Sequence, residues 1–148
     1  MSAPVITSKP TAPTKRIDLN ALGRHVLLEL NDCEQRMLTD ADLLKQTLID
    51  AATDAGAHVV ETVFHQFNPY GLSGVVVIAE SHITIHTWPE YGYAAVDVFT
   101  CGQPELADTI CTTISSRFKA QTTSVRAVDR GLNLPPQMAV LPQNATDA

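Results

Sequence analysis

The sequence predicts an α+β fold, a two-layer sandwich in which helices cover one face of a mostly antiparallel sheet. Three observations predict it. A chain of 148 residues suits one hydrophobic core, several short β-branched segments are joined by tight turns, and only two segments have a helical period. The other face of such a sheet would still need cover, either from the tails or from a second subunit.

Two segments have the period of an amphipathic helix. The first is expected to be capped by Thr39, with Asp42 at the capping-box position, and to stop at Gly56. The second is expected to begin at Pro104, because proline is tolerated in the first helical turn. The expected core faces are Leu44, Leu48, Ala51, Ala52 and Ala55 in the first, and Leu106, Ile110, Ile114 and Phe118 in the second.

The remaining apolar segments have the alternation or the β-branched composition of strands. The run 74–79 is continuously apolar, and we expect it to be a strand buried on both faces. Residues 89–92 are expected to form a tight hairpin between two strands. The expected strands are 23–30, 58–67, 74–79, 82–88, 93–100 and 124–128.

Charge and hydropathy exclude several classes of protein. The net charge is −6 and the isoelectric point is near 5.2, whereas a nucleic-acid or anionic-membrane surface needs a basic patch. The apolar run 73–79 is far shorter than the ~20 residues of a membrane helix. We therefore expect no nucleic-acid partner and no membrane span.

The cysteines and histidines do not predict a metal site. Cys33, Cys101 and Cys111 form no CxxC pair, which argues against a disulfide framework and a zinc knuckle. His82 and His86 with Cys101 make only a loose set of ligands, whereas metal sites bring three or four together. We expect no metal and a cytoplasmic location, where thiols stay reduced.

The two ends of the chain differ in composition from its centre. Residues 1–18 are rich in Pro, Thr, Ser and Lys without an apolar period, and we expect a disordered N-terminal tail. Residues 132–148 carry three prolines and are expected to form an irregular C-terminal tail. A single domain is therefore expected over residues 19–131.

Residues 73–102 hold most of the candidate reactive side chains. His86 lies five residues after Ser81, so a regular strand would point the two side chains to opposite faces. For His86 to act on Ser81, the chain would have to bend near Glu80. The candidates in this segment are Ser81, His82, His86, Glu90 and Cys101.

The hairpin geometry predicts which of these residues are neighbours. If the turn is centred on Tyr91, residues that face each other across the two strands have numbers that sum to about 182. Ser81 would then face Cys101, and His86 would face Val96. A reactive hydroxyl and a thiol would become direct neighbours, although a slip of one residue would undo this pairing.

The string ESHITIHTWPEYGYAAVDVFTCG, at residues 80–102, resembles the short prokaryotic S-adenosylmethionine decarboxylases. Further matching stretches lie at 22–25, 65–67, 69–71 and 73–81, and the similarity extends to about residue 131. The resemblance implies a proenzyme that converts S-adenosylmethionine to its decarboxylated form and CO₂ for spermidine biosynthesis. It also implies a homodimer of cleaved α/β protomers, in which the second face of the sheet is packed.

The resemblance also implies a role for each reactive residue. Ser81 would attack the carbonyl of Glu80, so that the chain is cleaved between these two residues. His86 would be the proton acceptor of this processing, which Ser73 assists. Residue 81 would become a pyruvoyl group, the covalent cofactor that forms a Schiff base with the substrate. Cys101 would then be the proton donor in decarboxylation.

Three further residues match substrate-binding positions of the family. Phe67 and Trp88 correspond to aromatic side chains that sandwich the adenine ring, and Glu90 to the carboxylate that accepts hydrogen bonds from both ribose hydroxyls. Gln66 and Asn68, which flank Phe67, depart from the residues of some relatives, and the departure concerns substrate affinity rather than the chemistry.

Two alternatives stay open on the residues alone. A pyruvoyl-dependent decarboxylase of a basic amino acid such as arginine or ornithine would use the same cleavage motif, although Phe67, Trp88 and Glu90 favour a nucleoside. An unprocessed paralogue would instead act as a regulatory subunit. A denaturing gel separates the latter from an enzyme, because only an enzyme would run as two fragments.

Overall fold

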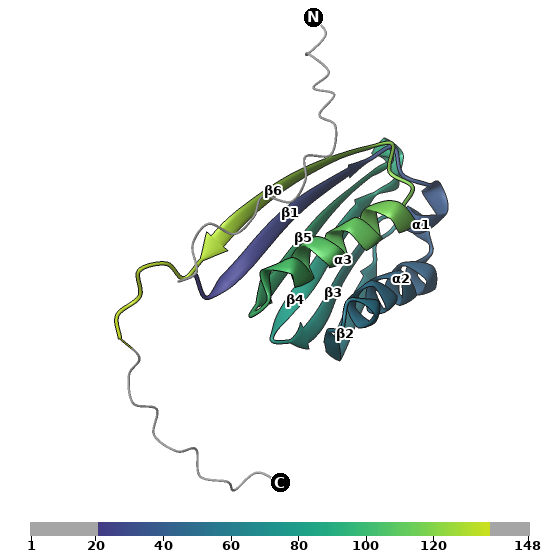
Figure 1. Cartoon of the computed structure of the whole chain (residues 1–148). Coiled ribbons are helices and arrows are strands. Elements are labelled where there is room, and N and C mark those ends of the chain that lie inside the picture. The colour runs from purple at the N-terminus through teal and green to yellow at the C-terminus, as the bar shows by residue number, and fades with distance from the viewer. Residues whose placement is uncertain (1–20, 137–148) are drawn as a thin grey trace, which may run out of the picture.

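The chain forms one six-stranded sheet with its helices on a single face (Figure 1). The computed structural model describes residues 21–136. The strand order is β2-β3-β4-β5-β1-β6, and every neighbouring pair is antiparallel, which confirms the predicted α+β class. The elements are β1 (Gly23–Asn31), α1 (Gln35–Thr39), α2 (Ala41–Asp54), β2 (His58–Gln66), β3 (Leu72–Ala79), β4 (Ser81–Trp88), β5 (Tyr93–Cys101), α3 (Pro104–Arg117) and β6 (Thr122–Arg130).

The core lies between the sheet and the helices α2 and α3. Alternate residues of each central strand point into it, since successive side chains of a strand face opposite sides. The predicted core faces are largely confirmed, with Ala55 and Leu106 only partly buried at the margin. The fully buried large side chains are Leu28, Leu30, Leu38, Leu44, Leu48, Leu72, Ile78, Ile83, Ile85, Ile110, Ile114 and Phe118.

The face of the sheet opposite the helices carries exposed apolar side chains. The predicted burial of 74–79 on both faces is wrong, because Val75 and Val77 are 37% and 38% exposed while Val76 between them is fully buried. Other exposed apolar side chains on the outer strands include Val63 and Val128. We call this side the open face, and it is the side that no described element covers.

The start of the first long helix differs from the prediction. Thr39 ends the short helix α1, and Asp40 is the N-cap of α2, with its side chain accepting a hydrogen bond from the Leu43 amide at 3.0 Å. The predicted cap at Thr39 is therefore wrong by one residue, because the adjacent Asp40 caps a helix at least as well as a threonine. None of the described helices has the length and apolar character that crossing a membrane requires.

The strand boundaries agree with the prediction to within a few residues. The last strand, β6, is longer than the predicted 124–128 because it pairs with β1 along its whole length. The predicted tail 1–18 and most of the predicted tail 132–148 lie outside the described residues.

Candidate functional site

Ser81 stands at the first position of β4, where the chain enters the strand after Glu80. Its hydroxyl donates a hydrogen bond to the carbonyl oxygen of Glu80, the carbonyl of the peptide bond that precedes it. The same hydroxyl lies 3.7 Å from the Cys101 sulfur at the end of β5. A hydroxyl, the carbonyl it would attack and a thiol therefore meet at one end of the central strands.

The register of this hairpin differs by one residue from the prediction. Ser81 pairs with Thr100, and His86 pairs with Ala95, so the numbers of paired residues sum to 181. The reason is the loop between Trp88 and Tyr93, which closes with an even number of residues: the 3₁₀ turn η1 (Pro89–Tyr91) and Gly92 in the left-handed region. The predicted approach of Ser81 to Cys101 is nevertheless confirmed, because Cys101 directly follows the partner of Ser81.

His86 and Ser73 form a second group, which lies elsewhere on the sheet. They are paired across β4 and β3, and the Ser73 hydroxyl is 2.6 Å from Nδ1 of His86. The bend expected near Glu80 does not bring His86 to Ser81, because β4 runs without interruption from Ser81 to Trp88. Five residues of strand correspond to roughly 16 Å, so His86 cannot touch Ser81 of its own chain.

The predicted substrate residues gather around this second group. Phe67, Trp88 and Glu90 line one cavity of about 350 Å³ together with Ser73 and His86. Phe67 is 50% exposed and Trp88 is 38% exposed, so part of each ring is open to a ligand, while one face of Trp88 stacks on Tyr93. The cavity is thus a shallow cleft with two aromatic rings and one carboxylate, which suits a flat ring joined to a group that donates hydrogen bonds.

Sequence reasoning missed several residues that line this cleft, among them Tyr70 and Thr87. Tyr70 lines it from the turn after Phe67 and is 52% exposed. Thr87 also lines it, and its hydroxyl accepts from the Leu72 amide at 2.9 Å and donates to the Leu38 carbonyl at 2.8 Å. An aromatic residue next to Phe67 was a usable signal for Tyr70, whereas nothing in the sequence distinguishes Thr87 from other strand threonines.

The rings of His82, Phe99 and His25 form a row on the open face, next to Ser81. The His82 and Phe99 centroids are 5.7 Å apart, and those of Phe99 and His25 are 5.6 Å apart. Arg130 lies 3.2 Å from Nδ1 of His25. Burial lowers the pKa of His25, with Arg130 and His82 acting in the same direction and Asp97 opposing them. His25 is therefore held mainly neutral at neutral pH.

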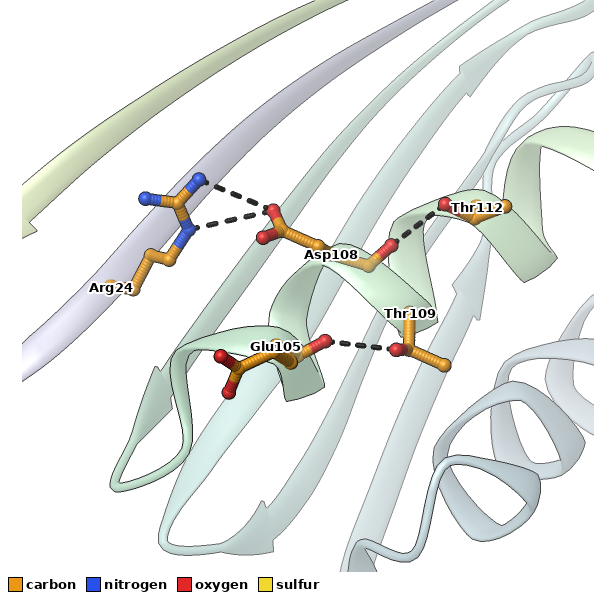
Figure 2. A network of polar contacts seen from close by, with 5 residues as sticks. All are labelled: Arg24, Glu105, Asp108, Thr109 and Thr112. Carbon is orange, nitrogen blue, oxygen red and sulfur yellow. Dashed lines mark hydrogen bonds and ion pairs between the residues drawn. The ribbon is translucent and has the colours of Figure 1, made fainter. Parts of the chain in front are cut away.

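On the helix-covered face, a buried ion pair ties β1 to α3. Arg24 is 5% exposed, and its Nε and Nη2 atoms lie 3.4 and 3.3 Å from Oδ1 of Asp108, as Figure 2 shows. Asp108 lies in the first turns of α3, just after the loop that follows Cys101. Burial raises the pKa of nearby Cys111 to about 12, with Asp108 adding to the rise and Arg24 opposing it, so this thiol stays protonated. Within residues 21–136, no three His, Cys, Asp or Glu side chains converge as metal ligands do.

Comparison with known proteins gives one family. The model of the S-adenosylmethionine decarboxylase family matches residues 24–131. A protein of Acetivibrio thermocellus called S-adenosylmethionine decarboxylase proenzyme is 49% identical over 114 residues, which cover 77% of this chain and 92% of that protein. A protein of Moorella thermoacetica with the same description is 47% identical over 123 residues, covering 83% and 98%.

Solved structures agree with the sequence relatives. The crystal structure of the adenosylmethionine decarboxylase from Aquifex aeolicus superposes with a TM-score of 0.74 at 30% identity, covering 82% of this chain and 99% of that one. A Trypanosoma brucei AdoMetDC monomer, at 16% identity and a TM-score of 0.52, shares the fold over 69% of this chain and 44% of its own length.

Proposed function

This chain belongs to the S-adenosylmethionine decarboxylase family, and we propose that it decarboxylates S-adenosylmethionine. It first cuts its own backbone before Ser81, which converts residue 81 to the pyruvoyl group that the reaction uses. The observation that carries the proposal is the contact of the Ser81 hydroxyl with the Glu80 carbonyl, with the Cys101 thiol 3.7 Å away. The product is the decarboxylated nucleoside used in spermidine biosynthesis. The cleft of Phe67 and Trp88 supports this substrate over arginine or ornithine.

Processing begins at the peptide bond between Glu80 and Ser81. The Ser81 oxygen bonds to the Glu80 carbonyl carbon, and the C–N bond of the peptide breaks, which leaves an ester and a free amine on residue 81. A base then removes the Cα proton, and the Cβ–O bond breaks to release the Glu80 carboxylate. Water hydrolyses the remaining dehydroalanine to a pyruvoyl group and ammonia, so that the chain becomes two pieces, 1–80 and 81–148.

The base is His86 of a second copy of the chain. His86 lies about 16 Å along β4 from Ser81 of its own chain, so it reaches a Ser81 only from another molecule. Both His86 and the exposed valines of β3 lie on the open face, which a second sheet would cover. Ser73 holds Nδ1 of His86, which leaves Nε2 free to take the proton. We therefore propose a homodimer that joins two open faces.

The same dimer would complete the substrate site. The pyruvoyl group supplies a carbonyl that captures the substrate amine and accepts the electrons released with CO₂. Phe67 and Trp88 stack on the adenine ring, and Glu90 accepts hydrogen bonds from the ribose hydroxyls. Cys101, beside residue 81, donates the proton to the product carbon. Each site would thus combine Ser81 and Cys101 of one copy with the cleft of the other.

We also propose a cytoplasmic location, which the free thiols support. The three cysteines Cys33, Cys101 and Cys111 are free in the described structure, which fits a cytoplasmic enzyme.

Intact-mass analysis of the purified chain tests the proposal. We expect two fragments divided between residues 80 and 81, the second of which begins with a pyruvoyl group and reacts with phenylhydrazine. The Ser81→Ala variant should remain one full-length chain. A folded wild-type chain that stays whole and binds no carbonyl reagent would refute the enzyme assignment and favour an unprocessed regulatory subunit.

A further inference from the structure

Thr100 of β5 is paired with Ser81 on the neighbouring strand, and its buried hydroxyl has no hydrogen-bond partner among the described residues. We propose that this hydroxyl, on Thr100, positions the cofactor by donating a hydrogen bond to a carbonyl oxygen that residue 81 carries after processing. The inference rests on the proposed function, since it needs the pyruvoyl group to form. It adds a buried residue of the helix-covered face to the site at residue 81.

Thr100 is enclosed by the protein. It is 2% exposed, and its Oγ1 atom finds no hydrogen-bond partner among the described residues. Leaving a buried hydroxyl unpaired is costly, and most buried polar side chains in proteins are paired. Such an exception calls for a partner other than the described side chains and backbone groups of the uncleaved chain.

The neighbours of Thr100 within the sheet leave one candidate for that partner. Its Cα partners are Ser81 on β4 and Arg24 on β1. The Nε and Nη2 atoms of Arg24 are turned towards Asp108 on α3 (Figure 2). The Ser81 hydroxyl is turned towards the Glu80 carbonyl and the Cys101 sulfur. Residue 81 is therefore the neighbour whose chemistry changes when the enzyme matures.

The proposed second copy of the chain does not supply the partner. Thr100 lies on the same face of β5 as the buried Val98 and Val96, which point to the helices, whereas the second copy would lie on the open face. Processing instead changes the adjacent residue. The Cα of Ser81 loses its nitrogen and its hydrogen and becomes a planar carbonyl carbon, so residue 81 gains an oxygen that accepts hydrogen bonds. The Thr100 hydroxyl then faces a carbonyl acceptor where the proenzyme had the serine side chain, which is engaged with the Glu80 carbonyl.

Replacing Thr100 by valine tests this role, because valine keeps the shape and removes only the hydroxyl. In the uncleaved Ser81→Ala background, Thr100→Val should leave Tm unchanged or raise it, since an unpaired polar group is removed. In the cleaved enzyme, Thr100→Val should lower kcat at least tenfold and slow the reaction with phenylhydrazine, with KM little changed. Thr100→Ser should restore both rates to within threefold. Thr47→Val, a buried threonine on α2, is the matched control and should leave kcat unchanged.

Three results would overturn the inference. A wild-type kcat in cleaved Thr100→Val would show that the hydroxyl does not act on the cofactor. A lower Tm in the uncleaved background would show that the hydroxyl already has a partner. A block of cleavage itself would place its action on Ser81 before the carbonyl exists. Failure of the wild-type chain to cleave would instead refute the proposed function, and the gel distinguishes that case.

Discussion

Mixing two inactive variants tests whether the processing site spans two chains. Ser81→Ala removes the nucleophile, and His86→Ala removes the proposed base, so neither variant alone should be cleaved. In a mixed dimer, Ser81 of one chain would meet His86 of the other. Ser81 and His86 of one chain are separated by roughly 16 Å along β4, which is about five times the length of a hydrogen bond. His86 therefore cannot take a proton from residue 81 of its own chain.

The yield of the mixed dimer can be calculated. Unfolding equal amounts of the two variants and refolding them together gives mixed dimers for about half of all molecules if pairing is random. Each mixed dimer holds one complete site and one site that lacks both residues. About half of the His86→Ala chains should therefore be cleaved, which a denaturing gel resolves as fragments 1–80 and 81–148.

A matched control removes His86 from every chain. Refolding His86→Ala with the double variant Ser81→Ala/His86→Ala provides the same dimers without any base and should give no fragments above background. If the first mixture also yields none while its dimers form, the two-chain site is wrong. Cleavage of a His86→Ala homodimer at the wild-type rate would equally refute His86 as the base.

Three further predictions follow from the site and its surroundings. Cys101→Ala should still be cleaved, as seen by intact mass, but should lose decarboxylation measured as CO₂ release. Glu90→Gln should raise KM for S-adenosylmethionine at least tenfold while cleavage before Ser81 is unchanged, and an unaltered KM would contradict its contact with ribose. Because burial raises the pKa of Cys111 to about 12, the unfolded chain binds fewer protons above pH ~9, and the free energy of unfolding should fall as pH rises towards 12. Urea titrations at pH 9.5 and 10.5 should show Cys111→Val reducing that fall by up to ~1.4 kcal/mol per pH unit.

The sequence predicted most of the elements because their patterns are strong and local. The helical face from Leu44 to Ala52 and the first-turn proline at Pro104 are set by neighbouring residues, and the structure agrees with both. The exact helix cap was not predictable, since Thr39 and Asp40 are both good N-caps and only the path of α1 decides between them. The prediction of the β4–β5 register was wrong by one residue for a similar reason. It depends on how the 3₁₀ turn and Gly92 close the loop, which composition does not fix.

The candidate site was predictable as a set of residues but not as an arrangement. The residues matched to the family are present, yet the sequence did not decide whether the chain bends near Glu80 to bring His86 to Ser81, and the unbroken strand β4 excludes that bend. The structure divides them into two groups at the two ends of one strand. No pattern in the sequence marked Thr100, because its interest comes from a missing partner, and that is visible only once burial is known.

The division of the site over the length of β4 constrains the symmetry of the proposed dimer. Consider a twofold axis that lies in the plane of the interface and runs perpendicular to β4. It would place the Ser81 end of one β4 strand against the His86 end of the other, and the same would hold at the opposite end of the pair. One interface would therefore create two complete processing sites, each of which combines residues from both chains. The exposed Val75 and Val77, which precede the cleavage point on β3, would then be buried by the same contact that supplies the base. Cleavage would depend on assembly, so dilution that separates the copies should slow it even though every reacting residue is present in each chain.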